Sequence, residues 1–344
     1  MTEFLPPSYR PAVTASPAER FAVNRVPGIH RKSPEALHLD DLELMMHWST
    51  TTYRSLARDH AAEKLWQITI PQLALQFSHL QHGLMALAAL QLARERPNPD
   101  HQGKYLVAAR EHYRIALAGI PLDSTEDLTL VQCNAVFALC AVLLSYTFAH
   151  GLMRPLRSAA QDRSRPPYLD EYHEISIISR RIVGIMMQII DRVAQGELHP
   201  LVEPDHSRPR MPDISQLLIL ALRQRNAREA KYSPTHEREV FDQTLDQLQL
   251  CLNRLMSGSE PRDFAFCWSS RTPARFHDLV QQRQPFALVI VAHYAVVLHH
   301  LHGLWWIGDW GTRILNEIVE TVDPEWWEVM RWPIDATGCV LPEA

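Results

Sequence analysis

Residues 285–298 read PFALVIVAHYAVVL, and this stretch decides the fold. It is apolar nearly all round, a pattern that is typical of a helix buried on every side. His299, His300 and His302 then restore polarity, and Gly303 interrupts the segment. A helix of this kind needs cover, so the sequence predicts that the rest of the chain supplies other helices around it.

The segment that follows is rich in tryptophan, since residues 285–333 hold six of the nine tryptophans in the chain. Asp309 is placed to cap a helix that begins at Trp310. Asp323 and Pro324 predict a third helix start, and Trp332-Pro333 predicts its end. Helices this short are marginal in water, and each indole must be covered, so we expect them to close over the central helix.

The pattern upstream predicts helices throughout. Apolar positions recur at helical spacing over residues 42–56, 73–87, 175–193 and 241–255, and residues 124–127 have the layout of a capping box. Ser233-Pro234 is placed to open the helix over 241–255. Residues 154–167 form a polar break, and six-residue alternation typical of a strand does not occur. The predicted fold is all-α, a single large domain built as an irregular multi-helix bundle.

Composition limits the domain organisation and the partners. Residues 1–36 form a Pro-rich leader that we expect to be disordered, and residues 37–344 form the helical domain. The formal charge is −5 without a dense Lys/Arg run, so we expect no direct nucleic-acid binding. The five cysteines lack CxxC spacing and are expected to be reduced thiols. No secretory signal is recognisable, which predicts a nuclear or cytoplasmic protein rather than a secreted one.

Residues 128–149 carry no charge and approach the length of a membrane span. Gln132, Asn134 and Ser145 interrupt the apolar run, and a strong basic flank does not follow it. We therefore interpret the segment as a core helix and expect no membrane partner.

Familiar catalytic signatures are missing, including GxGxxG, GxxxxGK[ST], GxSxG and HExxH. His79 with His82, and His299 with His302, place imidazoles three residues apart on a helix. Because eighteen histidines produce such pairs by chance, we expect no metal site and no cofactor.

His293 and Tyr294 lie inside the apolar helix, where a polar group needs a partner. A hydrogen-bonded core histidine is the favoured interpretation, and a catalytic base is the alternative. If the protein is an enzyme, the catalytic candidates are His293, Tyr294 and Asp309. The aromatic residues have two interpretations as well. Either their rings pack in the core and stabilise it, or they line a site for a flat apolar ligand. The residues predicted to bind that ligand are Phe286, His293, Tyr294, Trp305, Trp306, Trp310, Trp326 and Trp327.

Several motifs together are familiar. They are LELMMHWST at 42–50, Trp66 with IPQLA at 70–74, HGLMALAALQLA at 82–93, AHYAVVLH at 292–299, the Trp305-Trp306 pair, GDWG at 308–311, Trp326-Trp327 and Trp332-Pro333. The chain resembles, from about residue 37 to its end, the regulatory region of fungal zinc-cluster transcription factors, and most closely the sterol uptake control protein group. The match is firm at both ends and loose in the middle.

The resemblance implies an all-helical domain that binds a sterol-like, terpenoid-like or other apolar molecule and thereby controls a DNA-bound activator. It also implies a homodimer as the working form. The six closely spaced cysteines that begin such factors and bind two zinc ions are not found here, because the first cysteine is Cys133. Three interpretations stay open. The chain is a regulator domain without its own DNA-binding module, a cofactor-free isomerase or cyclase that acts on an apolar secondary metabolite, or a dimerising scaffold with a filled core.

Overall fold

Helix α13 (Pro285–His300) contains the stretch 285–298, and every residue from Phe286 to Leu298 is buried. Pro285 stands in its first turn, and the side-chain oxygen of Gln284 accepts a hydrogen bond from the amide of Ala287 at 2.7 Å. The helix packs against α10 (Arg238–Met256), α12 (Ala274–Gln281), α14 (Trp310–Thr321) and α15 (Arg331–Thr337). The predicted buried central helix is therefore confirmed.

The computed structural model describes residues 39–121, 124–153, 168–203, 213–257 and 262–341. Within these ranges the elements are helices and turns, without a strand, which confirms the all-α prediction. Residues Asp40–Ala344 form one compact unit. The predicted leader at 1–36 and the predicted polar break at 154–167 lie outside the described residues.

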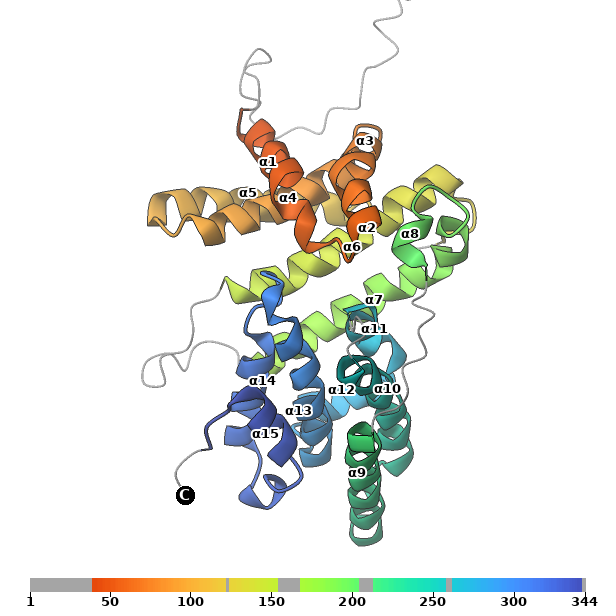
Figure 1. Ribbon diagram of the computed structural model, residues 1–344, viewed down its shortest axis with the longest axis vertical. Coiled ribbons are helices and arrows are strands. Elements are labelled where there is room, and N and C mark those ends of the chain that lie inside the picture. The colour runs from red at the N-terminus through yellow and green to blue at the C-terminus, as the bar shows by residue number, and fades with distance from the viewer. Residues whose placement is uncertain (1–38, 122–123, 154–167, 204–212, 258–261, 342–344) are drawn as a thin grey trace, which may run out of the picture. The chain divides into compact units, whose positions relative to one another are not determined.

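The first half of the unit is built on three long helices, α4 (Ser78–Glu95), α5 (Pro99–Leu117) and α6 (Leu130–Leu152), with α4 packed on both of the others (Figure 1). Gly83 allows α4 to approach α6, because a Cβ at this position would lie 2.9 Å from Leu139 Cδ1. Shorter elements precede them: α1 (Leu39–Thr50), η2 (Thr52–Ser55), α2 (His60–Lys64), the π-helix η3 (Leu65–Thr69) and α3 (Ile70–Ala74).

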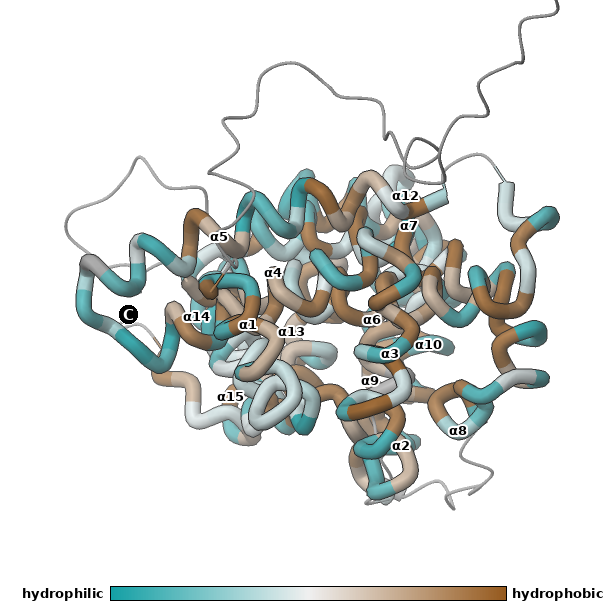
Figure 2. Tube along the Cα trace, turned by 90° about the horizontal axis from the view of Figure 1, so that it is seen from above, coloured by the Kyte–Doolittle hydropathy of each residue, from teal (hydrophilic) through white to brown (hydrophobic). Residues whose placement is uncertain are grey.

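The long helix α7 (Tyr168–Val193) lies along α6 and joins the two halves (Figure 1). After α7, the short helix α8 (His199–Val202) contacts α2 and α7. The second half also contains α9 (Asp213–Tyr232), α11 (Arg262–Arg271), η4 (Leu301–Gly303) and η5 (Pro324–Trp326). Figure 2 shows hydrophobic residues on α6 in the interior and hydrophilic ones on the outer windings of α5.

By length and composition, two described segments could cross a membrane: α6 and residues 285–303. Their most apolar windows are 83% and 78% buried inside the unit, so other helices already cover their apolar surface. This burial favours the interpretation of residues 128–149 as a core helix.

Several helix limits differ from the predictions. Residues 42–56 form α1 and η2 instead of one helix, and the buried face of α1 carries Leu44 and Trp48, whereas Leu42 and Met46 are exposed. The indole N–H of Trp48 donates to the carbonyl of Trp66 at 3.0 Å, which fixes that face inward. The predicted helix over 73–87 is broken after Ala74, and α4 starts at Ser78.

The predicted capping box at 124–127 is wrong, because the box belongs to Thr129 and Gln132 at the start of α6. The amide of Gln132 donates to Thr129 Oγ1 at 3.3 Å, and the amide of Thr129 donates to Gln132 Oε1 at 2.8 Å. Ser233-Pro234 lies in a turn before α10, which starts at Arg238. Trp332-Pro333 does not end a helix but lies within α15.

Candidate functional site: the C-terminal tryptophan cluster

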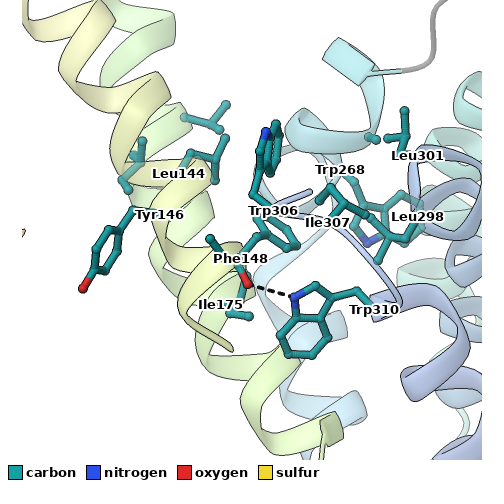
Figure 3. Close-up of a cluster of buried hydrophobic side chains, with 14 of the residues drawn as sticks. Leu144, Tyr146, Phe148, Ile175, Trp268, Leu298, Leu301, Trp306, Ile307 and Trp310 are labelled. Carbon is teal, nitrogen blue, oxygen red and sulfur yellow. Dashed lines mark hydrogen bonds between the residues drawn. The ribbon is translucent and has the colours of Figure 1, made fainter. Parts of the chain in front are cut away.

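Trp306 lies where the two halves of the unit meet. Its ring packs against Phe266 of α11, with centroids 4.9 Å apart, and against Phe148 of α6, with centroids 6.4 Å apart (Figure 3). Its indole N–H donates to the carbonyl of Ser55 at 3.4 Å. The side chain is almost wholly buried by these protein partners.

Trp310 is also buried, at the first residue of α14. Its indole N–H donates to the carbonyl of Phe148 at 3.0 Å, the dashed line in Figure 3. Gly151 makes room for the ring, because a Cβ at that position would lie 2.3 Å from Trp310 Cζ2. A larger residue at 151 would therefore displace the indole.

Trp305 is partly buried and ties the C-terminal elements to the first helices. Its indole N–H donates to Ser55 Oγ at 3.1 Å, and its carbonyl accepts a hydrogen bond from the guanidinium of Arg94. The indole N–H and the carbonyl of Trp305 thus bond to residues 250 and 211 positions away in the chain.

Phe286 and Trp326 belong to a second group of rings. Their centroids lie 6.3 Å apart, and Phe286 also meets Phe241 of α10 edge-on at 5.1 Å. The guanidinium carbon of Arg225 lies 4.2 Å from the centroid of the Trp326 ring. Trp327 is partly buried, and its indole nitrogen has no hydrogen-bond partner among the described residues. The predicted ligand-binding residues therefore do not line one common site: Trp306 and Trp310 pack around Phe148, whereas Phe286 and Trp326 pack on each other.

His293 is a hydrogen-bonded core histidine, as favoured from the sequence. Its Nδ1 lies 2.8 Å from the carbonyl of Val289, to which it donates, and its ring stacks on Trp332 with centroids 5.8 Å apart. Burial lowers the pKa of His293 to about 4, so the ring is neutral at pH 7.

Tyr294, like His293, is a buried side chain held by a backbone carbonyl and a stacked ring. Its hydroxyl donates to the carbonyl of Ala265 in α11 at 2.8 Å, and its ring stacks on Trp268 with centroids 4.6 Å apart. Burial raises the pKa of Tyr294 well above its usual value. A phenol in this state is a poor acid or base at neutral pH.

Asp309 occupies the N-cap position of α14, but its side chain makes no capping bond. The carboxylate pairs instead with Arg313, one turn along the helix, at 2.8 Å. The three catalytic candidates thus face three different partners: Val289 and Trp332, Ala265 and Trp268, and Arg313. This arrangement does not provide a shared acid and base for an isomerase or a cyclase.

The two best-formed pockets lie elsewhere. The larger, about 310 Å³, is lined by α14 and residues 338–340, and the smaller, about 180 Å³, is lined mainly by apolar side chains from 77–80 and from α6. None of the eight predicted ligand-binding residues lines either pocket.

The two histidine pairs make hydrogen bonds and ring contacts with protein groups. His82 Nδ1 lies 2.7 Å from His112 Nδ1, and His79 Nδ1 lies 2.9 Å from the carbonyl of Ile115. His299 and His302 stack with ring centroids 5.5 Å apart. In the described parts of the chain, no group of three or more His, Cys, Asp or Glu residues is arranged to hold a metal ion.

Sequence reasoning missed a row of buried polar residues on α7, a helix that packs against α11; the row comprises Tyr172, Ser176 and Ser179, next to His173. All four are buried although they are polar. The available signal was their spacing, because 172, 176 and 179 share one face of a helix that is otherwise lined by isoleucine and valine.

No protein-family model matches the chain. It is similar to a Zn(2)-C6 fungal-type transcription factor of Gibberella zeae, with 24% identity over 317 residues, or 86% of this chain. The match covers 61% of that protein, so the chain spans about three fifths of the length of this relative. The similarity supports a relationship to the fungal transcription factors, as the sequence motifs predicted.

Proposed function

We propose that this chain is the regulatory body of a transcription regulator related to the fungal Zn(2)-C6 factors. The observation that carries the proposal is the similarity to the Gibberella zeae factor over 86% of the chain. The all-helical unit from Asp40 onward supports it, because this is the fold that the resemblance implies. A regulatory role also fits the polar catalytic candidates, which are occupied by structural contacts.

A reporter assay tests this role. The chain is fused to an unrelated DNA-binding domain of known operator and expressed in a filamentous fungus that carries a reporter under that operator. We expect the fusion to change reporter transcription relative to the DNA-binding domain alone. A folded, nuclear fusion that leaves transcription unchanged under all growth conditions tried would reject the proposal.

Within this role, DNA reading comes from a zinc-cluster module outside these 344 residues, in a longer chain or in a partner. The cysteines support this part of the proposal, since there are five and the first is Cys133. The protein then works in the nucleus. A fluorescent fusion that stays out of the nucleus in every condition would contradict this location.

The finer part of the proposal concerns a ligand of the sterol uptake control group, an apolar molecule of sterol or terpenoid type. The buried aromatic rings of Tyr294 and Trp306 support it. Tyr294 stacks on Trp268 and Trp306 packs on Phe266, so a guest molecule must displace one of these rings. Cholesterol delivered from cyclodextrin should raise the unfolding midpoint by mass action, relative to cyclodextrin alone. An unchanged midpoint with both cholesterol and a terpenoid alcohol would count against this ligand class.

The proposal also includes a homodimer as the working form of the regulator. Leu42 and Met46 lie one turn apart on α1 and are both more than half exposed, which provides apolar area for self-association. Light scattering should give the mass of two chains, and Met46→Glu should reduce it to one. A monomer at all concentrations tested would remove the dimer from the proposal.

A further inference from the structure

Five buried polar atoms lie along the contact of α7 with α11 without a hydrogen-bond partner. They are Tyr172 Oη, His173 Nδ1, Ser176 Oγ and Ser179 Oγ on α7, and Trp268 Nε1 on α11. Each of these side chains is at most 6% exposed. We call this group the α7–α11 seam. Ser176 and Trp268 are the polar side chains next to the Tyr172 hydroxyl, but none of them reaches hydrogen-bond geometry.

Elsewhere in the described residues, buried side-chain atoms without a hydrogen-bond partner occur at seven residues, including Thr52, Asn134 and Trp327, and other buried polar groups are satisfied. The hydroxyls of Ser145 and Thr147 donate to backbone carbonyls one turn back on α6, at 3.1 and 2.8 Å. The indole N–H of Trp310 and the hydroxyl of Tyr294 also have carbonyl partners. Since an unmade hydrogen bond in a core is costly, five such groups in one place indicate a missing partner.

The surroundings of the seam restrict the partner. Trp268 stacks on Tyr294, and the Tyr172 ring lies 6.3 Å from the Tyr294 ring, so aromatic faces flank the polar atoms. The guanidinium of Arg180, also on α7, already donates to the carbonyls of Ser269 and Thr272. His277 bonds to Thr272 Oγ1 at 2.9 Å. The unpartnered groups are hydroxyls, an indole N–H and an imidazole nitrogen, which suit a neutral molecule.

We propose that the α7–α11 seam is the binding site for a small neutral ring compound that carries a hydroxyl or carbonyl group. Its ring lies against Tyr172, Trp268 and Tyr294, and its oxygen bonds with Ser176, Ser179 or the Trp268 indole. Because the aromatic rings are already stacked, α11 moves away from α7 when the molecule enters. The inference rests on the proposed regulatory function, for which it names the ligand class and the moving helix.

The test compares phenol with toluene, which has the same ring without the oxygen. Both are titrated into the full chain labelled with ¹⁵N, and the indole N–H signals are followed, with the Trp268 signal assigned from Trp268→Phe. We expect phenol to shift the Trp268 signal in a saturable way and toluene to bind at least about tenfold more weakly. Calorimetric titration of phenol gives the same comparison if Trp268→Phe does not fold.

Ser176→Ala/Ser179→Ala removes two of the proposed partners and should raise the dissociation constant for phenol about tenfold. Ser145→Ala is the matched control, because its buried hydroxyl is already bonded on α6, and it should leave phenol binding unchanged. Circular dichroism verifies that each variant is folded.

Equal binding of phenol and toluene, no saturable response to phenol, or phenol binding that the double variant does not weaken would each overturn the proposal. If the double variant only raises the unfolding midpoint, the seam is a strained contact without a ligand, and the proposal fails. The reporter assay is independent of these titrations, so failure of the ligand site and failure of the regulatory function are distinguishable.

Discussion

Gly311 shows how closely single residues determine this packing. A Cβ at 311 would lie 2.4 Å from the carbonyl oxygen of Ala295 and 2.5 Å from the amide nitrogen of His299, both backbone atoms of α13. Backbone cannot rotate away as a side chain can, so α14 must shift outward to admit even a methyl group. The GDWG motif thus contains a glycine that the contact between two helices requires.

We predict that Gly311→Ala lowers the free energy of unfolding by about 2 kcal/mol, the usual cost of overpacking a core. Urea titration followed by circular dichroism measures the change. Gly103→Ala is the control, because nothing lies within 4 Å of a Cβ at this exposed position in α5, and alanine there should be neutral or stabilising. Equal stability of Gly311→Ala and the unchanged chain would refute the close-contact argument.

Two buried histidines give a second residue-scale prediction. Burial lowers the pKa of His277 and of His293 to about 4 in the folded chain, against about 6.5 when unfolded. Because the folded pKa is the lower one, their contribution is complete above pH 6.5 and is lost as the pH falls toward 4. The loss is about 3 kcal/mol for each histidine.

Urea unfolding at several pH values between 7 and 4 checks this. The stability of the unchanged chain should fall across the window, and His293→Gln should flatten the slope by about one proton. If the variant and the unchanged chain have the same slope, His293 is not the buried neutral group described here.

The role of His293 was predictable from residues alone, because a polar side chain inside an apolar helix needs a nearby acceptor, and the i−4 carbonyl supplies one. The role of Asp309 was not. The carboxylate of an aspartate before a helix can bond either to the first amides of the helix or to a basic side chain one turn on. In this protein the Asp309 carboxylate pairs with Arg313. The choice depends on tertiary burial of Arg313, which no local pattern contains.

At the scale of elements, the end of α7 holds the loop that leads into α6. The guanidinium of Arg192 donates to the carbonyls of Thr125, Glu126 and Leu128 at 2.6, 3.3 and 3.0 Å. These carbonyls belong to no helix of their own. One side chain thus donates hydrogen bonds to three carbonyls of one turn, which would otherwise bond mainly to water.

We predict that Arg192→Met lowers the free energy of unfolding by about 2 kcal/mol, since three carbonyls each lose a hydrogen bond from the guanidinium. Amide exchange should quicken at residues 124–133 before it quickens elsewhere. Arg181→Met, an exposed position on the same helix, is the comparison and should change neither measurement. Unaltered exchange at 124–133 would show that the loop does not depend on Arg192.

Helix type was predictable because the periodic segment 175–193 matches α7 and the continuous apolar segment 285–298 matches α13. The limits of the helices, and the faces that they bury, were less predictable from the sequence. In α1 the i, i+3, i+4 pattern selected Leu42 and Met46, whereas Trp48 decides the orientation through its bond to Trp66. The break before α4 follows no proline or glycine, so it reflects packing of α3 that periodicity does not record.

At the scale of the whole molecule, residues 301–341 complete a core that the earlier helices begin. Trp305 and Trp306 bond to Ser55, Trp310 bonds to Phe148, and α14 covers α13. We predict that a chain ending at His300 loses cooperative thermal unfolding and binds a hydrophobic dye, because the apolar face of α13 is uncovered.

Ser55→Ala is the milder comparison, since it removes one hydroxyl that accepts from Trp305, and it should cost only about 1 kcal/mol with cooperativity intact. Differential scanning calorimetry measures both chains. A shortened chain with a sharp transition would mean that the first 300 residues form a core of their own.

The bonds between Ser55 and the tryptophans at 305 and 306 also carry a consequence for biosynthesis. The N-terminal helices leave the ribosome long before residues 305–321 are translated, so the apolar surface that α6 buries against Trp306 and Trp310 is exposed to solvent until then. Such nascent chains depend on chaperones to avoid aggregation. Expression yield should therefore follow chaperone supply more closely than that of a protein whose halves mature separately.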